Sequence, residues 1–139
     1  MDGARKAAEG VFTGEGGATR LLAGRRKTDG RLVFPCPSGG RASQFDLVEL
    51  GSHGRLWSWT VQRFAPKEPF NGFNGEDFRP YAVGYVELPG ELIVESRLVD
   101  VDFGQLHIGM PMQVTTEVYR VDADGSSVLT YAFRPSDGA

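Results

Sequence analysis

The chain has 139 residues, which is enough for one domain with a modest hydrophobic core. Its 40% hydrophobic content, with 19 Gly and 8 Pro, indicates many tight turns and favours short strands over a helical bundle. A net charge of −3 excludes an overall positive field that would attract nucleic acid, and a single Cys excludes an internal disulfide. The N-terminal MDGARKAAEG has no apolar signal segment and no run is long enough to span a membrane, so we expect a cytoplasmic protein.

Residues 1–18 are expected to contain a short helix and a flexible connector. Asp2 is positioned to cap a helix that runs to Glu9, and Gly10 is positioned to end it. Such a short helix is marginal in water, so it needs a surface on which to pack. The glycine-rich stretch GVFTGEGGA then forms the connector.

Residues 19–50 are expected to form a small hairpin followed by one further strand. The runs RLLAG and RLVFP flank Asp29-Gly30, a dipeptide that strongly favours a hairpin turn. The PCPSGG segment then interrupts regular structure, and FDLVEL (residues 45–50) is a short strand candidate.

Residues 51–135 contain nearly all of the aromatic and β-branched residues, in five alternating segments. We expect strands over residues 55–64, 81–88, 92–99, 113–121 and 128–133. Turn residues separate the second strand from the third, at Pro89-Gly90-Glu91, and the fourth from the fifth, at residues 122–125. This spacing predicts an all-β fold, either a small closed barrel or a sandwich, and residues 136–139 form a tail.

The longest connection, residues 65–80, is the main candidate for a functional loop. Long loops in compact domains are uncommon and often carry function. This loop contains Phe70, Phe73 and Phe78 together with Lys67 and Arg79. Its phenylalanines either line a ligand site or fold back to cap the barrel, and the sequence favours neither arrangement over the other.

Several segments, taken in order, have the spacing of a known family. They are GRLWSWTV (54–61), RPYAVGYVEL (79–88), SRLVDV (96–101), LHIGMPMQV (106–114) and the closing FRP (133–135). Over residues 19–135 the chain resembles bacterial and archaeal accessory proteins that place a rubredoxin-like zinc ribbon before an OB-fold domain. The resemblance implies a five-stranded OB-type barrel, preceded here by a degenerate ribbon hairpin and the short N-terminal helix.

The function that this resemblance implies is that of a non-catalytic accessory subunit. Its thiolase-like partner would carry the catalytic residues, as in benzoylsuccinyl-CoA thiolase, and the complex would perform thiolysis or aldol-type cleavage of acyl-CoA. The accessory subunit would stabilise the partner and help to enclose coenzyme A, in a hetero-oligomer with, for instance, two copies of each chain. No tightly bound cofactor and no membrane contact are expected.

The chain departs from the family at the zinc ribbon, where two C-x-x-C knuckles are usual. Arg26 and Asp29 stand at the first knuckle, and at the second Cys36 remains while Gly39 replaces its mate. Tetrahedral zinc needs about four ligands, and one thiolate with one carboxylate beside three cations falls short. We therefore expect no zinc. The hairpin would be held by its apolar residues, which are Leu21, Leu22, Val33 and Phe34.

The sequence shows no independent active site. A nucleophile needs an adjacent base. We expect His53 in an exposed turn, and His107 to point to solvent or to the partner. Cys36 lies between two prolines in an expected loop. Asp100 and Asp102 have the spacing of a carboxylate pair, but such pairs are common among solvated edge residues. We therefore expect no catalytic residue in this chain.

Coenzyme A joins a polyanionic nucleotide to a long neutral arm, so its site needs cations beside an apolar wall. The long loop and its flanks supply both kinds of residue. The candidate coenzyme-A site comprises Arg63, Lys67, Phe73, Phe78, Arg79 and Tyr81. The alternative is that its cations are solvated rim residues paired with acidic residues of the same loop.

Two other kinds of function compete with this one. A stand-alone OB module that binds single-stranded nucleic acid would stack bases on Trp57 and Trp59, but acidic residues outnumber basic ones and argue against that partner. A pure interaction module would expose apolar residues, for which the N-terminal region, the hairpin and Met110-Pro111-Met112 are candidates. The methionines fit a core equally well.

Overall fold

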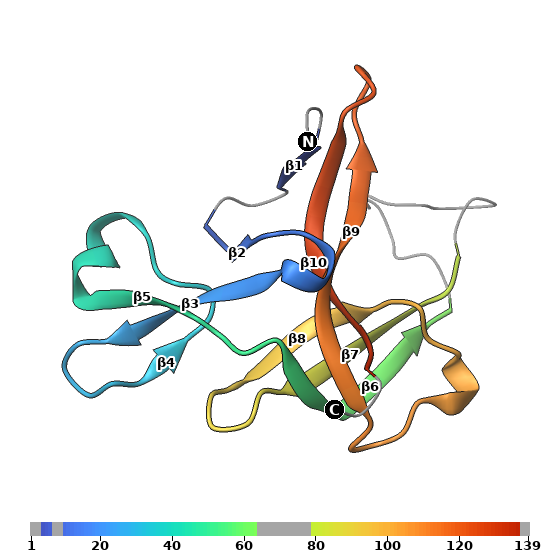
Figure 1. Cartoon of the computed structure of the whole chain (residues 1–139), viewed down its shortest axis with the longest axis horizontal. Helices are drawn as coiled ribbons and strands as arrows, with labels where there is room; N and C mark the ends of the chain where they lie inside the picture. Colours follow the sequence, from blue (N-terminus) through green and yellow to red (C-terminus); the bar gives the residue numbers. More distant parts are fainter. Residues whose placement is uncertain (1–3, 7–9, 64–78, 137–139) are drawn as a thin grey trace.

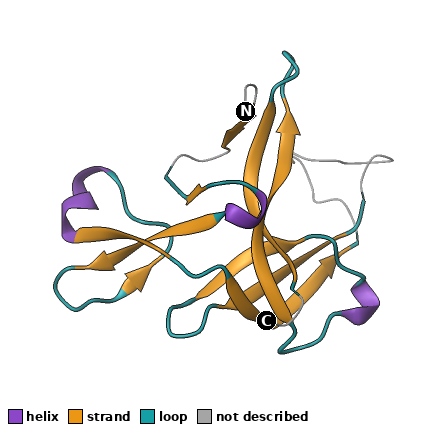
Figure 2. Cartoon of the chain, in the orientation of Figure 1, coloured by secondary structure: helices purple, strands orange, loops and turns teal. Residues whose placement is uncertain are grey.

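The computed structural model describes residues 4–6, 10–63 and 79–136, and its regular structure is almost wholly strand (Figure 2). The strands are β1 (Ala4–Lys6), β2 (Phe12–Thr13), β3 (Arg20–Arg26), β4 (Leu32–Val33), β5 (Phe45–Glu49), β6 (His53–Gln62), β7 (Tyr81–Glu87), β8 (Ile93–Leu98), β9 (Pro111–Val121) and β10 (Ser127–Pro135). Short 3₁₀ helices are η1 (Gly16–Ala18), η2 (Gly39–Gln44) and η4 (Phe103–Gln105). No helix in these ranges is long and apolar enough to cross a membrane.

Five strands close into a barrel in the order β6-β7-β8-β10-β9, and β9 pairs back with β6 (Figure 1). The neighbouring pairs are antiparallel except for β8 and β10, which run parallel. The last strand therefore inserts between the third and the fourth, which is the topology of an OB fold. The predicted all-β, five-stranded OB-type barrel is confirmed, and each predicted barrel strand corresponds to one observed strand.

A β-bulge in β6 changes which side chains face the barrel interior. The register with β7 shifts between Leu56 and Ser58, so two consecutive residues, Trp57 and Ser58, lie on the outer face. Leu56 before the bulge is buried in the core, and Trp59 after it packs against the same core. Trp57 is left 55% exposed.

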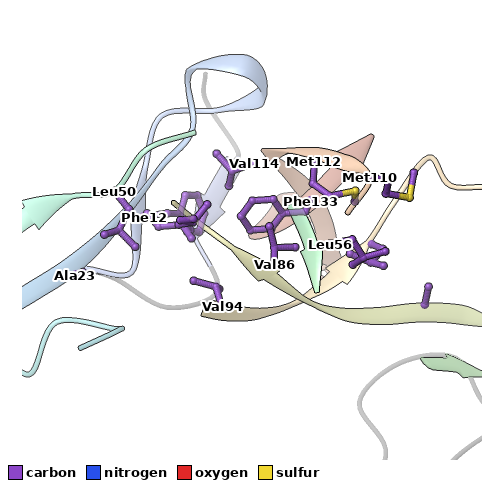
Figure 3. Close-up of a cluster of buried hydrophobic side chains, with 14 of the residues drawn as sticks. Phe12, Ala23, Leu50, Leu56, Val86, Val94, Met110, Met112, Val114 and Phe133 are labelled. Atoms are coloured by element: carbon purple, nitrogen blue, oxygen red, sulfur yellow. The ribbon is translucent and has the colours of Figure 1, made fainter. Parts of the chain in front are cut away.

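One continuous hydrophobic cluster joins the N-terminal strands to the barrel (Figure 3). Phe12 of β2 and Leu21 of β3 belong to the same buried cluster as Val94 of β8 and Phe133 of β10. The N-terminal region is therefore anchored in the barrel core and does not stand as a separate folding unit.

The N-terminal strands form a small sheet, which we call the ribbon, comprising β2 to β5 with β3 at its centre. β3 pairs antiparallel with β2, β4 and β5. The hairpin predicted around Asp29-Gly30 is present, and Gly30 has the positive φ of 74° that its turn requires. Of the four residues expected to hold it, Leu21 is buried and Phe34 packs edge-on against Tyr131 of β10, with ring centroids 5.6 Å apart. Leu22 and Val33 are half-buried.

The predicted N-terminal helix over residues 2–9 is wrong at the residues that the structure describes. Ala4–Lys6 forms β1, which lies parallel to β10 with Ala4 opposite Ser127 and Lys6 opposite Leu129. An isolated helix of that length gains little in water, whereas the edge of β10 offers unpaired backbone groups. Pairing with that edge is the more favourable outcome for this short segment.

Candidate functional site

The end of the β6–β7 hairpin at which Gln62 pairs with Tyr81 holds the described part of the candidate coenzyme-A site. Arg63, Arg79 and Tyr81 are described, whereas Lys67, Phe73 and Phe78 lie outside the described residues. Gln62 pairs with Tyr81, so the end of β6 and the start of β7 lie side by side. Arg63 and Arg79 therefore flank the same end of the hairpin, and both are exposed.

Arg63 and Tyr81 make contacts with different neighbours. The guanidinium carbon of Arg63 lies 5.7 Å from the centroid of the Phe103 ring in η4, the element between β8 and β9. The ring of Tyr81 is covered by Arg97 of β8, with the guanidinium carbon 4.8 Å from the centroid. Sequence reasoning missed Arg97, because its contact with Tyr81 depends on the register that places Val83 opposite Arg97 and Tyr81 on the diagonal.

Arg97 also forms an ion pair with Glu117 of β9. Its Nε lies 2.8 Å from Oε2 of Glu117, whose side chain is only 17% exposed. Burial raises the pKa of the Glu117 carboxyl above its usual value, and Arg97 opposes that rise. Tyr81, Arg97 and Glu117 thus form one contact cluster, in which the Arg97 charge is partly neutralised.

The raised pKa of Glu117 predicts a pH-dependent stability. A carboxyl whose pKa is higher in the folded state contributes stability below its unfolded pKa, and loses it as the pH rises through the folded pKa. Glu117→Gln stays neutral, so its thermal midpoint relative to the unmodified protein should rise as the pH increases above about 4. A difference that is the same at every pH would show that ionisation of Glu117 does not oppose folding.

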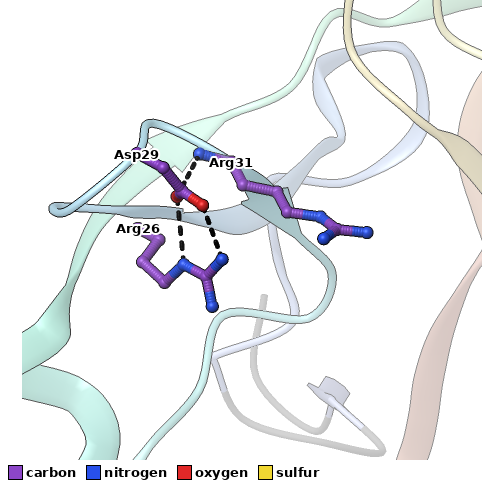
Figure 4. Close-up of polar contacts among 3 residues, drawn as sticks. All are labelled: Arg26, Asp29 and Arg31. Atoms are coloured by element: carbon purple, nitrogen blue, oxygen red, sulfur yellow. Dashed lines mark hydrogen bonds and ion pairs between the residues drawn. The ribbon is translucent and has the colours of Figure 1, made fainter.

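A bidentate ion pair spans the β3–β4 turn of the ribbon (Figure 4). Arg26 Nε donates to Asp29 Oδ1 at 3.0 Å, and Arg26 Nη2 donates to Asp29 Oδ2 at 2.5 Å. Asp29 Oδ1 also accepts the backbone N–H of Arg31 at 3.1 Å. These hydrogen bonds, that from Arg26 foremost, lower the pKa of Asp29.

The residues of the ribbon do not fit a zinc ion. Asp29 is engaged by Arg26, and Gly39 offers no side-chain donor. Cys36 lies against β3, where a Cβ added to Gly24 would be 3.1 Å from its Sγ. Across the described ranges no group of three or more His, Cys, Asp or Glu residues is placed to hold a metal ion.

The remaining polar candidates have local partners. His53 Nδ1 lies 2.8 Å from Ser52 Oγ, and His107 Nδ1 lies 3.0 Å from the carbonyl oxygen of Gln105. Asp102 accepts the Gly104 N–H at 3.0 Å and so caps η4, while Asp100 lies 3.4 Å from Arg134 Nε. Among the described residues, the hydrogen bonds of His53 and His107 are to Ser52 and Gln105 and not to Cys36.

Large apolar side chains are exposed on the outside of the barrel. Trp57, Tyr85 and Ile93 are 55%, 42% and 42% exposed and lie on three consecutive strands; we call them the outer-face patch. The Trp57 and Tyr85 rings meet edge to face with centroids 6.5 Å apart. Ile93 lies opposite Glu87 and therefore diagonal to Tyr85.

A second exposed group lies on the hairpin of β9 and β10, which projects beyond the barrel (Figure 1). Among the described strands, β10 is the partner of β9 beyond Gln113, and the distal half of β9 exposes Val118, Tyr119 and Val121. The methionines considered as contact residues are not exposed. Met110 and Met112 are 9% and 0% exposed and belong to the core: Met112 lies on β9, and Met110 immediately precedes that strand.

The strand order defines the chain as an OB-fold protein that carries an N-terminal β-ribbon. The family model for the ChsH2 C-terminal OB-fold domain matches residues 47–117. A DUF35 domain-containing scaffold protein of Pyrococcus furiosus is 31% identical over 121 residues, covering 84% of this chain and 83% of that protein. The chain belongs to this family of DUF35 proteins with a ChsH2-type OB fold.

Two further comparisons agree with this assignment. A DUF35 domain-containing scaffold protein of Methanocaldococcus jannaschii is 29% identical over 119 residues, covering 82% of this chain and 79% of that protein. Among solved structures, the chain is similar to one described as the Ltp2-ChsH2(DUF35) aldolase. The TM-score is 0.53 and the identity 26%, and the match covers 84% of each chain.

Proposed function

We propose that this chain is the non-catalytic accessory subunit of an acyl-CoA enzyme complex. Its partner is a thiolase-like enzyme that performs thiolysis or aldol-type cleavage of an acyl-CoA. The observation that carries the proposal is the match over more than four-fifths of the chain to a scaffold protein and to a protein of the Ltp2-ChsH2(DUF35) aldolase. The local partners of the histidines and aspartates agree with a supporting role.

The outer-face patch is the surface on which we place the partner enzyme. Trp and Tyr are enriched among the residues that dominate binding energy at protein interfaces. Here an exposed Trp57 and an exposed Tyr85 contact each other on a sheet, where a flat partner surface can cover both. Single-stranded nucleic acid would stack on the same rings. Arg55 and Arg97 share this outer face with Glu87 and Glu95, so the four side chains together offer no excess of positive charge to a polyanion.

Identifying what co-purifies with the chain from its native cell tests this proposal. Recovery of a thiolase-like enzyme in a fixed ratio to the chain supports it. Recovery of nucleic acid that persists near physiological salt, without an acyl-CoA enzyme, would contradict it and favour the OB module that binds single strands.

The end of the β6–β7 hairpin is where this subunit would help to enclose coenzyme A. Arg63 and Arg79 flank that end and are exposed, as a site for phosphate groups requires. Phe103 lies under Arg63 and supplies an apolar surface beside the cation. Tyr81 follows on the adjacent strand.

Removing both cations predicts a change in the KM of the complex. In the assembled complex, Arg63→Ala combined with Arg79→Ala should raise the KM for acyl-CoA about tenfold or more, because a hydrogen bond to a charged group contributes about 1.5–3 kcal/mol. The kcat should change little, since these residues would act in binding. Arg25→Ala, an exposed arginine of the ribbon, is the matched control. An unchanged KM in the double variant would remove both arginines from the site.

A further inference from the structure

The β3–β4 turn of the ribbon contains an ion pair at two positions that bind metal in the family that the chain resembles. Arg26 and Asp29 occupy the two places, three residues apart, where the resemblance places the cysteines of a metal knuckle. In a metal knuckle both residues bind the same ion and so close the turn. In this chain the two side chains bind each other, through two hydrogen bonds (Figure 4).

The ion pair is built into the backbone of the turn. The Gly30 N–H donates to the Arg26 carbonyl at 2.7 Å, and the Arg26 N–H donates to the Arg31 carbonyl at 2.8 Å. Asp29 Oδ1 also accepts the Arg31 N–H. The Asp29 carboxylate therefore links the Arg26 guanidinium to the backbone just before β4. Both carboxylate oxygens are engaged, and the adjacent guanidinium would repel a divalent cation.

Apolar residues of the ribbon pack against the barrel and fix the ribbon to it. Phe34, which follows β4, packs edge-on against Tyr131, and Leu21 and Phe12 are buried in the common cluster. Small zinc domains unfold without their metal because they have no core of their own. This ribbon shares the core of the barrel, so it has a source of stability that needs no metal.

We propose that the Arg26–Asp29 ion pair takes the place of a metal ion in closing the ribbon, and that the chain folds to its native state without zinc. This inference does not depend on the proposed function, because it concerns the isolated chain. The proposal gives Arg26 and Asp29 a structural role. Either of two substitutions should break their ion pair: one that removes the charge at position 29, or one that removes the planar guanidinium at position 26.

Metal analysis of the purified full-length chain is the first test. We expect zinc far below one equivalent after expression in zinc-supplemented medium, and a thermal midpoint that a chelator does not change. One equivalent of zinc, together with a fall in the thermal midpoint on chelation, would overturn the proposal.

Hydrogen exchange in the ribbon tests the role of the ion pair itself. Asp29→Asn should increase the exchange rates of the Gly30 and Arg31 amides, with the barrel amides unchanged. Asp46→Asn is the matched control, because Asp46 is an exposed ribbon carboxylate only 4.0 Å from a single Lys27 Nζ. Equal exchange in the two variants would contradict a closing role for Asp29.

A designed metal site gives an independent test. The variant with Arg26→Cys, Asp29→Cys and Gly39→Cys joins three new thiols to Cys36 and should bind one Co²⁺, detected by its thiolate absorption. Gly39→Cys alone supplies only two thiols and keeps the Arg26–Asp29 ion pair in the β3–β4 turn, so it should not bind. Binding of Co²⁺ by the chain that has Gly39→Cys as its sole change would contradict the proposal.

Discussion

Trp57→Ala and Tyr85→Ala should each weaken binding of the partner enzyme by about 30-fold or more. The estimate follows from the roughly 2 kcal/mol or more that central aromatic residues contribute at interfaces, where 1.4 kcal/mol is about tenfold in Kd. Both side chains are already exposed, so their truncation should leave the free energy of unfolding nearly unchanged. Titration calorimetry of the two purified subunits measures the effect.

Leu47→Ala provides the matched control for this experiment. Leu47 is a large apolar residue of β5, in the ribbon, and is 62% exposed. It is not part of the outer-face patch, which lies on β6, β7 and β8. Full affinity in the Trp57 and Tyr85 variants would contradict the interface that we place there. Loss of affinity in a Val121→Ala variant alone would assign the partner to the projecting β9–β10 hairpin.

Gly54→Ala should be strongly destabilising. A Cβ at Gly54 would lie 2.4 Å from the Glu87 carbonyl oxygen and 2.9 Å from a Val86 methyl carbon, so β6 and β7 would have to separate. β6 also pairs with β9 at this residue, which leaves it no direction in which to move. Overpacking of this kind costs about 1–3 kcal/mol of the free energy of unfolding.

Urea denaturation measures this loss, and Gly40→Ala is its control. An added Cβ at Gly40, in η2, meets no atom within 4 Å. The midpoint of the Gly54 variant should fall well below that of the Gly40 variant, with a similar slope. Equal midpoints would show that the barrel closes less tightly at β6 than the structure describes.

Local patterns in the sequence were enough to predict the strands, because alternation and turn residues act over a few positions. They did not predict the bulge in β6. Strict alternation places Trp57 and Trp59 on the same face, whereas the bulge exposes Trp57 and turns Trp59 toward the core. The parallel pairing of β8 with β10 joins residues far apart in sequence, and here the family resemblance supplied what local periodicity could not.

The candidate site shows the same division between local and distant contacts. Arg63 and Arg79 were chosen because they flank the long loop in the sequence, and the pairing of β6 with β7 places them at one end of the hairpin. Arg97 contacts Tyr81 only through the register of two strands. Arg26 and Asp29 were both singled out from the sequence as substitutes for metal ligands. Their mutual hydrogen bonds require the turn geometry, which residue types alone do not specify.

Reconstitution of acyl-CoA turnover tests the central claim most directly. The chain alone, the co-purified partner alone and the two together are assayed with the same acyl-CoA under the same conditions. The account predicts no turnover by the chain alone, and a higher rate or a longer-lived activity when it joins its partner. Turnover by the chain alone, lost on replacement of Cys36 or His107, would contradict it.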